Sequence, residues 1–246
     1  MSSLWTVAAS FAGFAVLVAG YYAYGPISRS RVRSFARHAR LAVTAGNGDQ
    51  VIRYLAVTRR WRSAGFAAGA VASVLVSLPD RVSVNFLALF AGWFAGALCA
   101  ELHLAFTASS TRRAASLDAR TPDRYVSWFV WGLLPAASVV LVAPWPTGRR
   151  PVLWTAIGLA ILLAVGLVRR SVLRRAQDPG EPDRVRADDA VRARSLHVLS
   201  GGGFTLAGLC GLAGWGGDPG VVVLIGLAIV LVGRYAASAR GPLAYA

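Results

Sequence analysis

The chain has 246 residues, is 56% hydrophobic, and carries 26 basic residues, all of them arginine, against 11 acidic ones. In a soluble domain, a net charge of +15 would suggest a nucleic-acid partner. Here the arginines alternate with long apolar blocks. This pattern excludes a soluble basic domain and favours a lipid bilayer with anionic headgroups as the partner, with no nucleic acid.

Long apolar stretches recur along the whole chain. A bilayer core of about 30 Å requires roughly 17 to 25 mainly apolar residues in a helix. Seven stretches meet or nearly meet this length, which predicts an all-α polytopic transmembrane bundle forming a single membrane domain over residues 1–246. The predicted spans are 4–25, 63–79, 83–106, 126–144, 152–168, 196–215 and 219–236.

The first span predicts an uncleaved anchor with the N-terminus outside. No basic residue precedes it, whereas Arg29, Arg31 and Arg33 follow it at once. The resulting topology puts 23 arginines on the cytoplasmic side and three on the outer side. Such an asymmetry is typical of an N-out, C-in membrane protein. The predicted basic cytoplasmic loops are 26–62, 109–125 and 169–195.

The segment 27–43, directly after the first span, has an apolar and a basic face at helical spacing. One interpretation is an amphipathic helix in the membrane interface. The other is a solvated basic loop whose only role is to set the topology. The arginines that would contact lipid headgroups are Arg31, Arg33, Arg37 and Arg40.

The remaining six spans form three apolar hairpins, each preceded by a basic segment. The hairpins begin near residues 63, 126 and 196 and would all point the same way. This arrangement is not the inverted repeat of many secondary transporters. The regular spacing fits either an internal duplication or a simple alternation of loops and spans.

Glycines at a spacing of four predict close helix packing. Gly65 and Gly69, and again Gly92 and Gly96, form small-xxx-small faces that allow two helices to approach closely. Such faces usually pack within one bundle and sometimes form a dimer interface. The triplet 201–203 lacks the residues of a phosphate-binding loop and predicts a flexible or closely packed point of the sixth span.

Ionisable residues are rare inside the predicted spans. Glu101 and His103 lie toward the cytoplasmic end of the third span, and His197 enters the sixth span at a similar depth. Because charge is costly in a bilayer, Glu101 is a candidate coupling carboxylate. It also fits an interhelical hydrogen bond or ion pair with His197 or an arginine. Asp188 and Asp189 are explained at this stage by the dipole of a short charged helix.

Two segments resemble recurring stretches of uncharacterised multi-pass membrane proteins of actinobacteria. They are AASLDARTPDRYV, residues 114–126, and ADDAVRARSLH, residues 187–197. The resemblance covers these cytoplasmic segments and the span starts beside them. It implies a protein of the bacterial cytoplasmic (inner) membrane, and brings no catalytic residues with it.

The sequence gives no positive sign of catalysis, so we expect no enzyme, no cofactor and no metal site. Cys99 and Cys210 lie in apolar spans, where a disulfide or a metal cluster is not expected. The favoured function is a non-catalytic accessory or scaffolding subunit whose basic cytoplasmic face meets lipid headgroups or another membrane or cytosolic protein subunit. The alternative is a small transporter or permease-like component with Glu101 as coupling carboxylate.

Overall fold

A computed structural model describes residues 2–77, 86–107, 125–144, 151–174, 181–215 and 218–238. Within these ranges the chain forms eight α-helices and no strands, which confirms the predicted all-α class. The helices are α1 (Ser2–Tyr24), α2 (Arg29–Ala39), α3 (Gly48–Ser77), α4 (Phe86–Thr107), α5 (Trp128–Val142), α6 (Val152–Arg174), α7 (Pro182–Trp215) and α8 (Pro219–Ser238).

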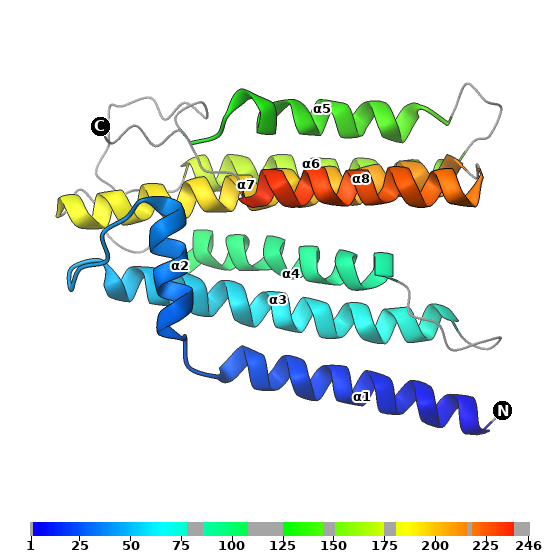
Figure 1. Cartoon of the computed structure of the whole chain (residues 1–246), viewed down its shortest axis with the longest axis horizontal. Helices are drawn as coiled ribbons and strands as arrows, with labels where there is room; N and C mark the ends of the chain where they lie inside the picture. The colour runs from blue at the N-terminus through cyan, green and yellow to red at the C-terminus, as the bar shows by residue number, and fades with distance from the viewer. Residues whose placement is uncertain are drawn as a thin grey trace.

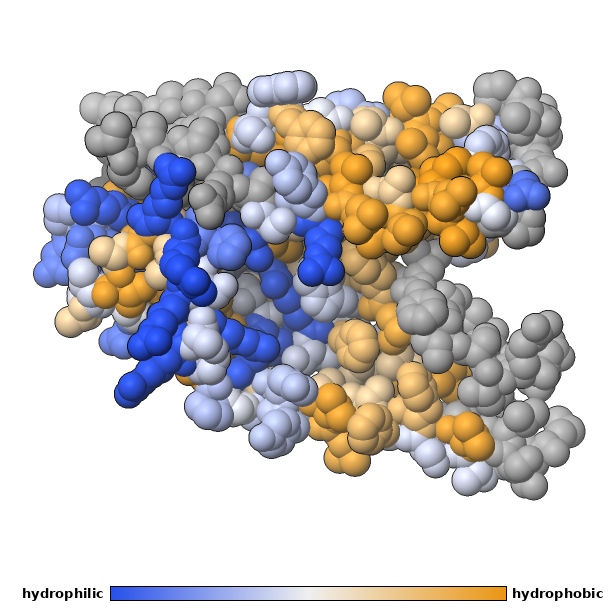
Figure 2. All heavy atoms as spheres, in the orientation of Figure 1, coloured by the Kyte–Doolittle hydropathy of each residue, from blue (hydrophilic) through white to orange (hydrophobic). Residues whose placement is uncertain are grey.

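All helices except α2 run along the long axis of the molecule, and α2 crosses that axis (Figure 1). The chain turns by 73° between α1 and α2. The N-terminus of α1 lies at the end opposite to α2, whereas α3 and α7 both begin at the end where α2 lies (Figure 1). Hydrophilic side chains gather at that same end, and hydrophobic side chains cover the visible helices farther along (Figure 2).

Fewer helices meet the requirements of a membrane span than the seven predicted. Three are long and apolar enough, namely α6, α7 and α8, and the bent pair α1 and α2 makes a fourth if it is counted as one span. The described apolar parts of α4 and α5, 88–104 and 128–142, are too short for this criterion. The apolar part of α3 follows several turns that carry Arg53, Arg59, Arg60 and Arg62.

The helices extend well beyond the apolar stretches on the basic side, into the predicted basic segments 26–62 and 169–195. The first contains α2 and the start of α3, and the second contains the end of α6 and the start of α7. Hydropathy detects only the part of a helix that is apolar, whereas Ala and Arg favour a helix without regard to the bilayer. The predicted loop 109–125 lies outside the described residues except for Tyr125. The same holds for most residues of the predicted outer connections between spans, which are 80–82, 145–151 and 216–218.

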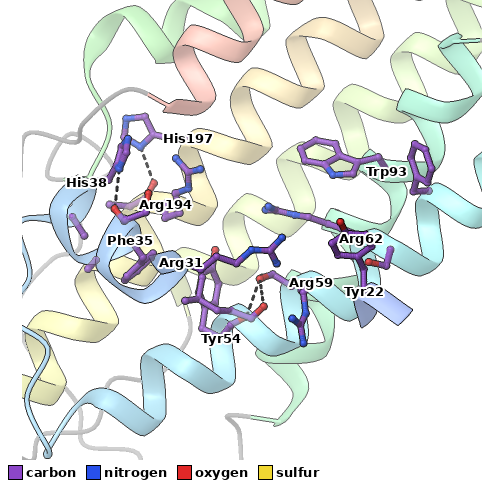
Figure 3. Close-up of a pocket in the computed structure, with 18 of the residues that line it drawn as sticks. Tyr22, Arg31, Phe35, His38, Tyr54, Arg59, Arg62, Trp93, Arg194 and His197 are labelled. Carbon is purple, nitrogen blue, oxygen red and sulfur yellow. Dashed lines mark hydrogen bonds between the residues drawn. The ribbon is translucent and has the colours of Figure 1, made fainter. Parts of the chain in front are cut away.

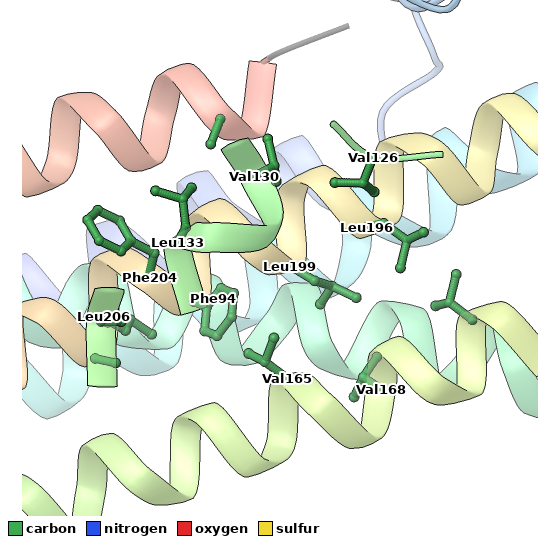
Figure 4. Close-up of a cluster of buried hydrophobic side chains, with 14 of the residues drawn as sticks. Phe94, Val126, Val130, Leu133, Val165, Val168, Leu196, Leu199, Phe204 and Leu206 are labelled. Carbon is green, nitrogen blue, oxygen red and sulfur yellow. The ribbon is translucent and has the colours of Figure 1, made fainter. Parts of the chain in front are cut away.

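Helix α7 is the central helix of the C-terminal half, in contact with α5, α6 and α8. The glycine triplet 201–203 explains how it fits. A Cβ on Gly201 would collide with the backbone of α8, one on Gly202 with Phe94 of α4, and one on Gly203 with Val165 of α6. Phe94 and Val165 belong to the large apolar cluster that surrounds α7 (Figure 4). The triplet therefore lies in a continuous helix at a closely packed point.

The four glycines of the predicted small-xxx-small faces bring α3 and α4 together inside one chain. A Cβ on Gly65 or Gly69 would collide with the backbone of α4, and a Cβ on Gly92 or Gly96 with the backbone of α3. The second hairpin is built differently, because α5 and α6 each pack mainly on α7 and little on one another. The three hairpins therefore do not share one packing arrangement.

Polar contacts join the starts of α3 and α7 at the basic end. The fully buried Asn47 donates from Nδ2 to the backbone oxygens of Ala42 at 2.9 Å and Asp183 at 3.5 Å. Thr44 donates from Oγ1 to Asp183 Oδ2 at 2.9 Å, and Arg184 donates from Nε to the Gly46 oxygen at 3.2 Å. These contacts fix the connector between α2 and α3 against the first turn of α7.

Candidate functional site: an arginine-lined cavity

A cavity of about 670 Å³ lies at the basic end, lined by residues of α1, α2, α3, α4 and α7 (Figure 3). Its polar lining is strongly cationic, and no acidic side chain is among the described residues that line it. The arginines of the lining are Arg31, Arg59, Arg62 and Arg194, and the histidines are His38 and His197. Four fixed positive charges around one cavity make it a candidate site for an anion.

Packing of α2 against α3 and α7 sets the position of Arg31 and His38. The helix begins at Ser28, whose Oγ accepts a hydrogen bond from the backbone N–H of Arg31. It ends at Arg40, which adopts a left-handed conformation with φ of 49°. Phe35 is buried against Tyr54 with ring centroids 6.0 Å apart, inside an apolar cluster that includes residues of α7. The apolar face of α2 thus packs on protein.

Arg59 closes the cavity next to the end of α1. Its guanidinium donates to the backbone oxygens of Ala23, Gly25 and Pro26, so it caps the C-terminal turn of α1. Burial, and then the positive charges of Arg31 and Arg60, lower the pKa of Arg59 below its usual value. The side chains of Arg31 and Arg59 therefore repel one another, and an anion between them would relieve that repulsion.

Arg62 lines the cavity with a guanidinium that stacks near an aromatic ring. Its Cζ lies 5.1 Å from the ring centroid of Trp93, a cation–π distance. Its Nε is buried and has no hydrogen-bond partner among the described residues. The planar guanidinium can thus offer hydrogen-bond donors to a ligand while the indole of Trp93 supports it from one side.

His197 and Arg194 line the cavity from α7. His197 is only 1% exposed, and its Nδ1 lies 2.7 Å from the Ala193 oxygen. Since a carbonyl only accepts, Nδ1 carries the proton, and the buried Nε2 has no partner among the described residues. Arg194 donates from Nη1 to the Ala237 oxygen at 2.7 Å, at the end of α8.

Tyr54 connects the cavity to the intramembrane carboxylate proposed from the sequence. Its hydroxyl donates to Glu101 Oε1 at 3.5 Å and lies 3.3 Å from Ser195 Oγ. Burial, and next the negative charge of Glu101, raise the pKa of Tyr54 to about 12. Glu101 itself is 4% exposed and does not line the cavity.

The structure separates the three ionisable residues singled out from the sequence. His197 lines the cavity and Glu101 lies behind Tyr54. His103 is exposed on the other side of α4, with its ring centroid 6.1 Å from that of Trp61. The described residues contain no group of three or more His, Cys, Asp or Glu that could hold a metal ion.

The arginines expected to contact headgroups divide into two sets. Arg31 lines the cavity, whereas Arg33, Arg37 and Arg40 are exposed and do not line it. Sequence reasoning did not identify the remaining cavity arginines, which are Arg59 and Arg62 of α3 and Arg194 of α7. Their signal was present, because Arg59 and Arg62 are three residues apart in front of an apolar helical stretch and share one helix face.

Asp188 and Asp189 have another role than the one given by the helix dipole. Both are buried beyond the first turn of α7. Asp188 Oδ2 accepts from Nε of the fully buried Arg192 at 2.7 Å, and Asp189 Oδ1 accepts from the Tyr125 hydroxyl at 3.0 Å. The dipole explanation is therefore wrong: these carboxylates satisfy buried donors on α7 and on the segment before α5.

Comparisons with known proteins found no relative of this chain. No protein-family model matches the chain, and no curated protein or solved structure shows a match.

Proposed function

We propose that this chain is a seven-span protein of the bacterial cytoplasmic membrane, with its N-terminus outside and its basic segments and C-terminus inside. Two features support this topology. Apart from α2 the helices run along the same direction, and hydrophilic side chains gather at the end away from the N-terminus (Figures 1 and 2). The proposal treats the chain as a single membrane domain and includes the resemblance of residues 114–126 and 187–197 to multi-pass proteins of actinobacteria.

Within this topology the protein is a non-catalytic accessory or scaffolding subunit with a basic cytoplasmic face. The observation that carries the proposal is the exposure of Arg33, Arg37 and Arg40 on a helix that is fixed to the protein by its own apolar face. Because Phe35 is buried inside the protein, α2 presents these charges without inserting that side chain into lipid. Anionic headgroups and an acidic surface of a second subunit both suit such a face.

Affinity purification from the native host in mild detergent, with mass spectrometry of the co-purifying proteins, tests this function. We expect a partner in stoichiometric amount, which is released when Arg33, Arg37 and Arg40 are changed together to Gln. A matched variant with Gln at Arg53 and Arg186, exposed arginines of α3 and α7, should retain the partner. Purification of the wild-type chain without any partner would overturn the accessory function.

A transporter with Glu101 as coupling carboxylate is the second candidate. Its support is the position of Glu101, buried on α4 in contact with a tyrosine that lines the cavity. Protonation of Glu101 would then be communicated to the cavity through the Tyr54 hydroxyl.

A further inference from the structure

We propose that the arginine-lined cavity binds the phosphate group of an anionic glycerophospholipid, with the acyl chains directed along α1, α3 and α4. The inference rests on the proposed position of the basic end at the cytoplasmic membrane surface. The proposed lipid site is separate from the exposed basic face of α2, and the proposed function of that face does not depend on it.

The charge of the cavity selects an anion. Arg31, Arg59, Arg62 and Arg194 line it, and no described lining residue is acidic. Arg59 and Arg194 already donate to helix-end carbonyls, so they contribute mainly charge. Arg62 lines the cavity, its Nε has no hydrogen-bond partner among the described residues, and its guanidinium can offer a fork to the ligand. A guanidinium fork matches two phosphate oxygens, which makes Arg62 the expected direct contact.

His197 adds a buried polar atom that nothing in the described chain satisfies. Its Nδ1 donates to the Ala193 oxygen, so the neutral ring presents Nε2 as an acceptor. Buried polar atoms normally have partners, and this one belongs to a residue lining the cavity. Nε2 itself is covered, so a headgroup hydroxyl, as in phosphatidylglycerol, would reach it only after the covering side chains shift.

The other part of the lining is apolar and distinguishes a lipid from free phosphate. Val18 and Ala19 of α1, Phe66 of α3 and Trp93 of α4 line the same cavity. All four belong to stretches that the sequence assigns to membrane spans, whereas Arg31 and Arg194 precede or follow such stretches. A ligand that fills both parts must have an anionic head and an apolar tail.

The test is lipid-dependent thermal stabilisation of the full chain, purified in a neutral detergent. The probes are phosphatidylglycerol and phosphatidylcholine in mixed micelles, and inorganic phosphate at matched ionic strength. We expect saturable stabilisation by phosphatidylglycerol with at least about tenfold weaker binding of the other two probes. Phosphatidylcholine carries the same phosphate but adds a trimethylammonium that the cavity arginines repel, and inorganic phosphate lacks the apolar tail. Equal binding of phosphatidylcholine, or equal binding of inorganic phosphate, would overturn the lipid site.

Three variants locate the site. Arg62→Gln should weaken phosphatidylglycerol binding about tenfold or more, whereas Arg33→Gln, an exposed arginine of α2 outside the cavity, should leave it nearly unchanged. Arg62→Lys keeps the charge without the fork and should bind between wild type and Arg62→Gln. Melting without lipid identifies any variant that has failed to fold.

Equal losses in Arg62→Gln and Arg33→Gln would show general surface attraction and overturn the cavity site. Failure of the lipid site is distinguishable from failure of the accessory function, because Arg33, Arg37 and Arg40 govern partner release and Arg62 governs lipid binding.

Discussion

Arg192 donates from Nε to Asp188 Oδ2 across 2.7 Å, and the arginine side chain is entirely buried while the aspartate side chain is 8% exposed. The Nη1 of the same arginine donates to the Val172 oxygen at 2.9 Å and to the Leu173 oxygen at 3.4 Å. One guanidinium thus joins a carboxylate of α7 to the last turns of α6. Both charges depend on this arrangement, because neither is solvated by water.

Removal of one member of this pair should destabilise the folded protein strongly. Arg192→Met leaves the Asp188 carboxylate buried without its cation, at a cost of about 3–5 kcal/mol. The measurement is the melting temperature in detergent. The control is Arg186→Met, which removes an exposed arginine 3.9 Å from Asp183 and should change stability by less than about 1 kcal/mol. Equal melting temperatures for the two variants would contradict a structural role for the buried pair.

A methyl group at Gly92 should separate α3 from α4. The Cβ of Gly92→Ala would lie 2.7 Å from both the backbone nitrogen and the Cα of Gly69, so the two helices must move apart. Overpacking of this kind costs about 1–3 kcal/mol. Gly166→Ala is the control, because its Cβ would meet nothing within 4 Å on α6. A melting temperature of Gly92→Ala at or above that of Gly166→Ala would show that the helices are not in contact there.

Glu101→Ala and Glu101→Gln should differ. Glu101→Ala removes the acceptor of the Tyr54 hydroxyl and should cost about 1–3 kcal/mol, seen as lower abundance in the membrane. Glu101→Gln retains an acceptor oxygen and should keep most of the abundance. Comparison with Tyr54→Phe and with the double variant measures the coupling between the two side chains. Full abundance of Glu101→Gln together with loss of a proton-linked phenotype would instead favour the transporter.

Tyr54 should titrate later than an ordinary tyrosine. Its pKa is raised from 10.0 to about 12, so the folded chain retains this proton where the unfolded chain loses it. Stability from this group is therefore complete below pH 10 and is lost as the pH rises through 12. Ultraviolet difference titration of the folded protein should show a late component that is absent from Tyr54→Phe. Identical titration curves for both proteins would contradict the raised pKa.

Hydropathy located the apolar helices but not their full length. The predicted spans 152–168 and 219–236 lie within α6 and α8, because an apolar run long enough for a bilayer is also a helix. The same pattern could not show that α3 and α7 begin 14 or 15 residues before their apolar parts, at Gly48 and Pro182. Charged residues lower the mean hydropathy and so end the apolar signal, although the helix continues through them.

The cavity could be anticipated only in part. His197 was identified because an ionisable residue inside a predicted span is rare, and Arg31 because it lies on an amphipathic segment. Arg62 and Arg194 come from helices separated by 132 positions in the sequence, and only the packing of α3 near α7 brings them to one cavity. No local sequence pattern can predict that two residues so far apart in the sequence line the same cavity. The buried Asp188–Arg192 pair was missed for another reason, since its spacing of four is equally common on exposed helix surfaces.

The contacts of Asn47 bear on the order in which the chain is completed during synthesis. Its Nδ2 donates to an oxygen 136 positions later, and the neighbouring Thr44 hydroxyl to a carboxylate 139 positions later. The ribosome must therefore release the start of α7 before these groups find their partners. Until then the connector between α2 and α3 lacks these partners within the chain, and a translational arrest before residue 183 would leave it in that state.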